Sequence, residues 1–378
     1  MVELIFGSIF MMLHSYLSSV ADHRRAQGRR YELDYVLLFS VLAIVCGATS
    51  YRKIRSFIKV HLALFRDLYG VKWKRAPAHT SIRSILLGVN AEELESAFRA
   101  HSGALLEELE PAQNKWISLD GKTLRGSFDH FLDQKAVHML SAFLQEHQLI
   151  LGHLEIAEKS NEIPAVQRLI EELGLEGYTY TVDAMHCQKK TFEISIDSKS
   201  ELIAQVKENQ PNLLDHCQAI AEQNGPSSWF EEPFSRGRNR IENRSVAIFP
   251  AQLPEDNEWQ PWVQAIAQVD RYTLRFDTKE KTWHDSEETA YYVLSESAQA
   301  PSVAQAIRGH WGIENRDHYV RDVTLKEDAS RIRRNPTIFA RLRSFALNIL
   351  RANGIQNISE TLYENALNIH QVLEYKGV

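Results

Sequence analysis

The sequence predicts an α/β protein with a helical N-terminal domain, a mixed-sheet domain and an all-β insertion. Three observations predict this fold class. Residues 1–110 have the apolar spacing of helices, residues 115–223 alternate between strand and helix patterns, and residues from about 225 to 297 contain short apolar runs between polar loops. The 378 residues, 44% of them hydrophobic, are enough for a large core and suggest two or three domains.

Helices account for the N-terminal domain, residues 1–110. Residues 34–70 have helical spacing broken at Gly47 and Gly70, and residues 79–109 add two helices, the second with Asn90 as N-cap and Glu93 at the capping-box position. The apolar run 35–48 is too short to cross a membrane, so we expect a buried helix. The first residues lack the positive start and the cleavage site of a signal peptide, which favours a cytoplasmic protein with no membrane contact.

A mixed sheet follows the linker 110–114. Strand patterns cover residues 115–120, 136–147 and 149–158, and the next elements are a helix at 163–175, a strand at 178–184, a helix at 187–200, a strand at 201–209 and a helix at 211–223. Three strands followed by alternation predict a mixed sheet with helices on its faces. We therefore treat 115–378 as one domain.

The predicted insertion interrupts this domain at about 225–297. Its strands are expected at residues 240–251, 262–276 and 289–296. A long helix should run from about 302 to 323, and a further helix from 335 to 353.

Charge is distributed unevenly along the chain. Residues 1–114 carry 14 Lys and Arg against 11 Asp and Glu, residues 301–378 carry 11 against 8, and residues 115–300 carry 18 against 30, for a total of −6. An acidic centre between basic ends fits a carboxylate site that needs metal with nucleic-acid-binding surfaces around it, although scattered solvated charge also gives such differences.

The three cysteines form no CxxC pair, which argues against a zinc knuckle or a disulfide framework.

Two aspartates stand at predicted strand ends. Asp120 ends the predicted strand 115–120, and Asp183 lies at the end of the predicted strand 178–184. Binding sites form where the ends of parallel strands meet. Asp120 followed by Gly121 is equally typical of a hairpin turn, and Asp183 is equally placed to cap the following helix. Both interpretations stay open on the residues alone.

Glu314 is the third candidate carboxylate. By helical spacing it shares a face with Val303, Ile307 and Trp311, and an acid on an apolar face is costly unless it is paired or binds a metal. The alternative is an ion pair with a neighbour on the same stripe, which carries His310, His318 and Arg321. These three either contact phosphates or balance the acid.

Three converging carboxylates suit Mg²⁺, with Mn²⁺ as a substitute, because Mg²⁺ takes oxygen ligands and keeps positions for water and phosphate. Two such ions, about 3.5–4 Å apart, stabilise the attacking and leaving oxygens of an in-line displacement at phosphorus. One carboxylate must bridge them, and Asp120, at a central strand end, is the best placed.

Six ordered motifs carry a family resemblance. They are "DHRRAQGRRYELDYVLLFSVLAIVCGA", "LDGKTLRGS", "VDAMHCQK", "LIAQVKENQP", "YYVLS" and "IRGHWGIENRDHYVRDVTLKEDASRIRR". Together they resemble the H-repeat-associated, or Rhs-element-associated, DDE transposase family over almost the whole chain, including "APAHTSIRSIL" of a transposase-associated helical domain. The resemblance implies an RNase H-like catalytic core in which Asp120, Asp183 and Glu314 form the DDE triad.

The sequence departs from the patterns of the resemblance in a few places. In the wider superfamily's Tyr-Arg-Glu-Lys signature, His310 stands at the Arg position and Arg321 at the Lys position, and Tyr319 and Arg321 differ from the form common after the Glu. Glu208 stands where "KGNQ" has a glycine. Glu327, in an acidic cluster with Asp322 and Asp328, is the second choice for the third ligand, and we expect it to be structural instead.

Basic residues near these motifs are the candidates for DNA contact. Phosphate contacts position DNA without reading its sequence, and the alternative for each basic set is a solvated helix face. The candidates are Lys122, Arg125, Lys189, Lys190, His310, His318, Arg321, Arg331, Arg333 and Arg334.

The sequence thus predicts a DDE transposase of an insertion-sequence-like element that cleaves DNA with Mg²⁺ and joins the freed ends to target DNA. A cleavage-only nuclease on the same fold and a degenerate copy that only binds DNA are the two alternatives. The resemblance further implies DNA ends and target DNA as partners, a homodimer acting on paired ends, and a bacterial cytoplasmic protein that associates with the nucleoid when bound to DNA.

Overall fold

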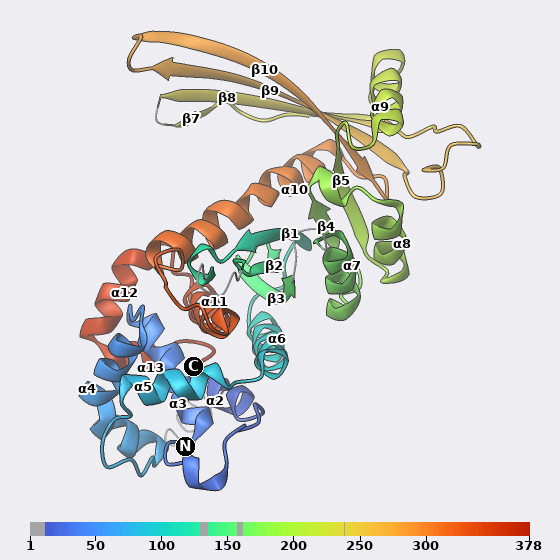
Figure 1. The fold of residues 1–378 in the computed structure, drawn as a ribbon. Helices are drawn as coiled ribbons and strands as arrows, with labels where there is room; N and C mark the ends of the chain where they lie inside the picture. The colour runs from blue at the N-terminus through green and yellow to red at the C-terminus, as the bar shows by residue number, and fades with distance from the viewer. Residues whose placement is uncertain (1–11, 129–134, 157–161, 238) are drawn as a thin grey trace. The chain divides into compact units, whose positions relative to one another are not determined.

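The computed structural model describes residues 12–128, 135–156, 162–237 and 239–378 (Figure 1). The chain forms two compact units: unit 1 consists of Met1–Gln113, Gly121–Asn161 and Glu314–Val378, and unit 2 of Asn114–Asp120 and Glu162–Ile313. The predicted linker at 110–114 coincides with the first boundary. The residues predicted as one domain, 115–378, contribute to both units. The apolar residues 1–11 lie outside the described part of the chain.

Unit 1 is mainly helical. The N-terminal helices are α2 (Met12–Leu17), α3 (Leu33–Val45), α4 (Tyr51–Tyr69), α5 (His79–Leu87) and α6 (Ala91–Glu107), and the C-terminal helices are α11 (Pro336–Ala352), α12 (Ile358–Leu367) and α13 (Ile369–Leu373). The four longer N-terminal helices and α11 match the predicted ranges. The last two, α12 and α13, lie beyond the final helix that the apolar spacing predicts.

Two of these helices form the centre of unit 1. Along α3 almost every residue from Leu33 to Val45 is buried, which confirms the buried helix expected from its apolar run, and α11 is buried to a similar degree. The two helices pack against each other. None of the helices within the described ranges is long and apolar enough to cross a membrane.

The start of α6 shows why its boundary was predictable. The Asn90 side chain accepts hydrogen bonds from the backbone N–H groups of Glu92 and Glu93, as the N-cap prediction requires. The Glu93 carboxylate accepts instead from the backbone N–H of Ala21, at 2.7 Å. The capping-box residue therefore ties the segment after α2 to α6.

A β-hairpin completes unit 1. Strands β2 (His138–Leu144) and β3 (Leu149–Ile156) pair antiparallel through a turn with Gln148 at a positive φ of 57°. The Asn348 side chain of α11 donates to the Ile150 carbonyl at 2.8 Å and accepts from the Ile150 N–H at 2.9 Å. An edge strand needs such partners for its backbone groups when it is buried, so Asn348 fixes α11 against β3.

Unit 2 contains the remaining strands. They are β1 (Trp116–Thr123, whose last residues belong to unit 1), β4 (Thr179–Val182), β5 (Glu201–Val206), β6 (Ser228–Glu231), β7 (Ser235–Gly237), β8 (Arg240–Pro250), β9 (Ala265–Asp277) and β10 (Thr282–Leu294), and its helices are α7 (Glu162–Leu173), α8 (Lys189–Asp197), α9 (Pro211–Gln223) and α10 (Ala300–Gly312). The strand order is β1-β4-β5-β10-β9-β8-β6, with β7 paired to β8.

Both pairing directions occur in this sheet. Strands β1, β4 and β5 are parallel to one another, as their α-helical connections require, whereas β10, β9, β8 and β6 pair antiparallel. The mixed sheet is therefore as predicted. The predicted insertion is indeed all β, but its strand β10 pairs with β5 and so extends the sheet directly (Figure 1).

Helix α10 covers one part of this sheet. Its residues Val303 and Ile307 are buried in a hydrophobic cluster with Ile203 of β5 and Val246 of β8. Beyond Gly312 the chain continues as two π-helical stretches, Ile313–His318 and Val320–Thr324. The predicted helix 302–323 therefore exists, but its second half has wider turns than the spacing prediction assumed.

Candidate active site

The register of β1 and β4 relates Asp120 to Asp183. The paired residues run from Trp116 with Thr179 to Ser118 with Thr181, a constant offset of 63 positions, and the same offset separates Asp120 from Asp183. Asp183 follows directly on the last residue of β4. The paired residues end at Ser118 and Thr181, and Asp120 and Asp183 each lie two residues further along, which places them at the same level if the register continues. Strand β1 runs on to Thr123, so Asp120 lies within the strand and not at its end as predicted.

His310 of α10 lies on the same side. Its Nδ1 is 2.9 Å from the hydroxyl oxygen of Thr181, two residues before Asp183, and its Nε2 is 3.5 Å from Oδ1 of Asp183. If Nδ1 accepts the hydroxyl hydrogen of Thr181, then Nε2 carries the proton and donates to Asp183. The hydrogen bond from His310 lowers the pKa of Asp183 against the opposing effect of burial.

The exposure of this pair indicates which group is available to a ligand. Asp183 leaves 66% of its side-chain surface exposed, whereas His310 leaves only 16%. The carboxylate is therefore open to solvent and the imidazole supports it from within. Thr181 is a residue that the sequence reasoning missed, although its position two residues before Asp183 on a strand already placed it on the same face.

Glu314 belongs to unit 1 and is the first residue of its segment Glu314–Val378, while Asp120 and Asp183 belong to unit 2. Glu314 is exposed, and so is Trp311, with 52% of its surface accessible. This corrects the expectation that both share the buried face of Val303 and Ile307. The hydrophobic cluster under α10 ends at Ile307, and from Ile313 the π-helical hydrogen bonding changes the spacing on which that face was drawn.

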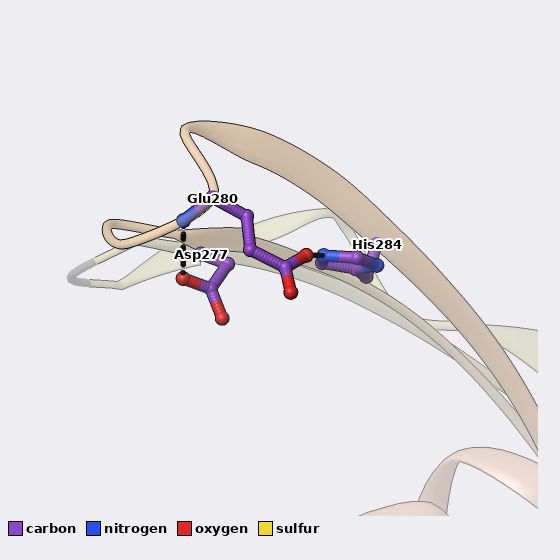
Figure 2. Close-up of side chains that lie close together, drawn as sticks. All are labelled: Asp277, Glu280 and His284. Carbon is purple, nitrogen blue, oxygen red and sulfur yellow. Dashed lines mark hydrogen bonds and ion pairs between the residues drawn. The ribbon is translucent and has the colours of Figure 1, made fainter.

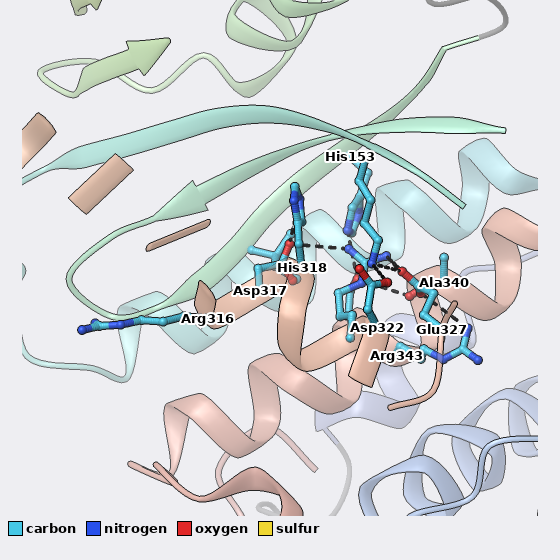
Figure 3. A network of polar contacts seen from close by, with 12 residues as sticks. His153, Arg316, Asp317, His318, Asp322, Glu327, Ala340 and Arg343 are labelled. Carbon is cyan, nitrogen blue, oxygen red and sulfur yellow. Dashed lines mark hydrogen bonds and ion pairs between the residues drawn. The ribbon is translucent and has the colours of Figure 1, made fainter. Parts of the chain in front are cut away.

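A buried charge cluster in unit 1 is formed by residues that lie shortly after Glu314 in the chain, among them Asp317 and Glu327, and by residues of other segments (Figure 3). Glu327 lies at its centre, with Oε1 2.8 Å from Nζ of Lys122 and 3.0 Å from Nη2 of Arg321, and Oε2 3.4 Å from Nη1 of Arg343. Lys122 also pairs with Asp322. Burial raises the pKa of Glu327, but these three cations outweigh that effect, so its pKa lies below the ordinary value. Glu327 is thus held as a buried anion.

Three of the predicted DNA contacts are part of this buried region. Arg321 has no exposed surface, Lys122 has 6% and His318 has 8%. Burial, together with the charges of Lys122 and Arg321, lowers the pKa of His318 to about 3, so the imidazole is neutral. These residues are enclosed inside unit 1, and Lys122 and Arg321 pair with carboxylates there. Direct DNA contact by them stays a prediction, and these contacts do not favour it.

The other basic candidates have accessible side chains. Lys189 is 2.6 Å from Glu258 and Lys190 is 2.9 Å from Glu193, which are surface ion pairs that a phosphate can displace at little cost. Arg125 keeps 79% of its side-chain surface exposed. The run from Arg331 to Arg334 lines a cavity of unit 1. Contact with DNA stays a prediction for these residues.

A different acidic group lies at the tip of the β9–β10 hairpin (Figure 2). Asp277, Glu280 and His284 each offer a ligand atom within 4.8 Å of the others. Oδ1 of Asp277 accepts from the backbone N–H groups of Lys279 and Glu280, at 2.7 and 3.0 Å, and these bonds lower the pKa of Asp277. The arrangement closes the hairpin turn, and none of the three is a predicted catalytic residue.

Comparison with known proteins supplies the family. Residues 117–349 match the model described as Transposase DDE domain, which is more than half of the chain, and residues 14–102 match the model described as DDE_Tnp_1-associated. This chain belongs to the DDE transposase family.

Relatives of this DDE transposase include two Escherichia coli proteins. YhhI of strain K12, an H repeat-associated protein named as a proposed transposase, is 30% identical over 89% of this chain and 90% of its own length. YncI of strain O157:H7, also named as a proposed transposase, is 30% identical over 96% of this chain and 94% of its own length. The H-repeat-associated resemblance expected from the motifs is thereby confirmed.

A solved piggyBac transposase synaptic complex with hairpin DNA is similar at 9% identity and a TM-score of 0.42, covering 98% of this chain and 78% of that one. The family match and the order of helices and strands in this DDE transposase support the fold class more strongly than this similarity does. They confirm the predicted fold class, an RNase H-like order of elements with a mixed sheet, a β-rich insertion and a helical N-terminal region.

Proposed function

We propose that this DDE transposase cuts DNA at the ends of an insertion-sequence-like element and joins them to target DNA, using Asp120, Asp183 and Glu314. The observation that supports this most is the parallel pairing of β1, which contains Asp120, with β4, which Asp183 directly follows, together with the contact of His310 with Asp183. Glu314 completes the set by its place in the "HWGIEN" motif.

The donor set fits a hard divalent cation. Two carboxylates on one face, one of them largely exposed and held in its ionised form by His310, offer the oxygen ligands that Mg²⁺ prefers, and Mn²⁺ accepts the same ligands. When bound there, the ion would activate the attacking oxygen and stabilise the leaving oxygen. Asp120 is our first choice among these ligands, since it lies on β1 in the parallel part of the sheet.

Two phosphoryl transfers follow from this assignment. In cleavage, a water oxygen bonds to phosphorus, the bond from phosphorus to the 3′ oxygen breaks, and the leaving oxygen takes up a proton to become a 3′-OH. In joining, that 3′-OH bonds to a target phosphorus, its proton is released, and the target's own 3′ oxygen leaves. In both steps the carboxylates of this chain would hold the cation that offsets the negative charge of the reacting phosphate.

A cleavage assay tests the proposal. Duplexes that carry the DNA flanking the gene are incubated with Mg²⁺ and the full-length chain, and Asp120→Asn, Asp183→Asn and Glu314→Gln should each lose cleavage by at least about a thousandfold, as expected when a group that stabilises the transition state is removed. Asp215→Asn, an exposed aspartate on α9, is the matched control and should cleave normally. Full activity of Asp120→Asn in a folded protein contradicts the assignment.

Pre-cleaved ends separate the alternatives. A transposase joins such ends to a target plasmid, a cleavage-only nuclease does not, and a degenerate copy binds DNA without any Mg²⁺-dependent product. Action on paired ends further predicts a homodimer, which light scattering with and without end DNA would detect.

A further inference from the structure

A basic cavity of about 640 Å³ lies within unit 1, and its described lining includes none of the residues proposed for catalysis. Its walls are the first residues of α4, Arg83 and Leu87 of α5, and the loop 326–334. Five of the residues that line it are cationic, and the described lining contains no Asp or Glu: Arg83, Lys326, Arg331, Arg333 and Arg334. A cavity of this size with one sign of charge concentrates anions.

Most of these cations are not already used by carboxylates. In the described part of the chain, no Asp or Glu lies within ion-pair distance of Arg83, Lys326, Arg331 or Arg334. Lys122 and Arg321 of the same unit differ from them, because both pair with acids. Gathering several like charges around one space is unfavourable unless a counter-charge is bound there.

Contacts with other parts of unit 1 fix the loop 326–334, which supplies most of these cations. Glu327 is fixed by the buried charge cluster, and Arg343 donates to the carbonyl of Leu325 at 3.2 Å. The Asn335 side chain donates to the carbonyls of Leu87 and Val89 at 3.3 and 3.1 Å, which ties the far end of the loop to the end of α5.

Gly126, of the "LDGKTLRGS" motif, lets this loop approach closely. A Cβ added at Gly126 would lie 1.7 Å from the carbonyl oxygen of Ser330, so another residue there must displace the loop. The cationic wall is therefore preorganised, and binding an anion requires little ordering of the chain.

We propose that this cavity binds backbone phosphates of DNA. The inference rests on the proposed function in that it takes DNA as the partner, and it adds a site that holds the DNA at a place where no reacting carboxylate is needed. The N-terminus of α4, a helix of 19 residues, adds a favourable dipole at the cavity wall.

A second cavity of about 640 Å³ lies in the same unit. It lies on another face of α5, lined by Ser81, Ser84 and Ile85 of that helix and by Arg24, Arg30, Arg55 and Arg75. In a helix, residues 83 and 87 face one way and residues 81, 84 and 85 another, so α5 stands between two basic cavities. A DNA backbone that crosses α5 would meet cations on both sides.

Binding without catalysis tests this inference. Fluorescence anisotropy of labelled duplex DNA is measured with the full-length chain in EDTA, over a series of KCl concentrations. Removal of one bound phosphate should reduce the slope of log K against log salt by ~0.9, so Arg83→Gln should lower it by about that amount and Arg83→Gln with Arg334→Gln by ~1.8, for every DNA sequence alike. Arg168→Gln, an exposed arginine on α7, is the matched control and should leave the slope unchanged.

A second arm distinguishes DNA from a free anion. The melting temperature is compared with inorganic phosphate and with duplex DNA at equal phosphate concentration and ionic strength, and only DNA should raise it. Wild-type salt slopes in folded Arg83→Gln and double variants overturn the proposal. Stabilisation by inorganic phosphate together with unchanged DNA binding also overturns it, in favour of a small-anion site.

The result is separable from the catalytic assignment. If the cavity variants bind normally while Asp120→Asn loses cleavage, only the cavity inference fails. If Asp120→Asn still cleaves while the cavity variants lose salt dependence, only the catalytic assignment fails.

Discussion

His310 is the residue whose surroundings say most about the chemistry of the site. It bonds Thr181 through one ring nitrogen and faces Asp183 with the other, so it fixes the orientation of a carboxylate that is otherwise open to solvent. Groups that orient ligands in this way typically change metal affinity more than they change the fold. The superfamily's arginine position is thus occupied by a side chain that supports a proposed ligand.

Replacing His310 should therefore weaken the metal response. We expect His310→Ala to raise the Mg²⁺ concentration for half-maximal cleavage by ~10–100-fold. His310→Gln, which keeps a donor near the Nε2 position, should lie closer to wild type. A half-saturation concentration that is the same in wild type and His310→Ala would contradict this role.

The pH profile gives a second readout for His310. The hydrogen bond lowers the pKa of Asp183, so the wild-type carboxylate stays ionised to lower pH. In His310→Ala that pKa rises toward the ordinary value. The acid limb of activity should consequently move to higher pH, which a merely structural role would not produce.

At the scale of the elements, α6 combines an N-cap that the sequence predicts with a buried carboxylate that contacts two other elements. Asn90 caps its N-terminus, and Glu95 one turn later accepts from the backbone N–H of His153 on β3 at 2.6 Å and from Nε of Arg341 on α11 at 2.6 Å. Burial raises the pKa of Glu95, but His153 and Arg341 outweigh it, so its pKa is lowered. The helix thus needs both its cap and its buried anion.

The cap gives a measurable prediction for α6. Asn90→Ala should lower the free energy of unfolding by ~1 kcal/mol, since two backbone N–H groups lose their acceptor, whereas Asn90→Gly should lower it by only a few tenths. Asn90→Asp keeps the acceptor and serves as the control. Urea titration of the full chain checks this, and equal losses in Asn90→Ala and Asn90→Asp would show that the cap is not the cause.

At the scale of the whole molecule, the buried charge cluster holds together segments that are far apart in the chain. Glu327 joins Lys122 at the end of β1, Arg321 of the π-helical stretch and Arg343 of α11. Removing one partner of such a group leaves the others buried and uncompensated. The resulting destabilisation affects every segment that meets there.

We therefore expect Glu327→Gln to destabilise the protein by ~3–5 kcal/mol. Asp328→Asn is the matched control, because its partner Arg125 is exposed and 3.6 Å away, and such pairs contribute ~0–1 kcal/mol. Chemical denaturation measures both, and similar values for the two variants would contradict the cluster's role.

The pH dependence of stability has a defined sign here. The pKa of Glu327 is lower in the folded protein than in the unfolded chain, so its stabilisation is complete above the unfolded value and is lost as pH falls toward the folded value. The stability of wild type should thus decrease on acidification below about pH 4.3, the ordinary value of a glutamate. Glu327→Gln should lack that part of the decrease.

By itself the sequence determined the family, most of the longer helices and strands, and the N-cap of α6, because apolar periodicity and caps are local properties of the chain. Only the tertiary structure decided that β1 and β4 pair in parallel, that Lys122 and Arg321 are buried in ion pairs, and that α5 lies between two basic cavities. A lysine or arginine looks the same in a sequence whether it meets a phosphate or a buried carboxylate. Its partner is chosen by contacts between residues up to hundreds of positions apart, which no local pattern records.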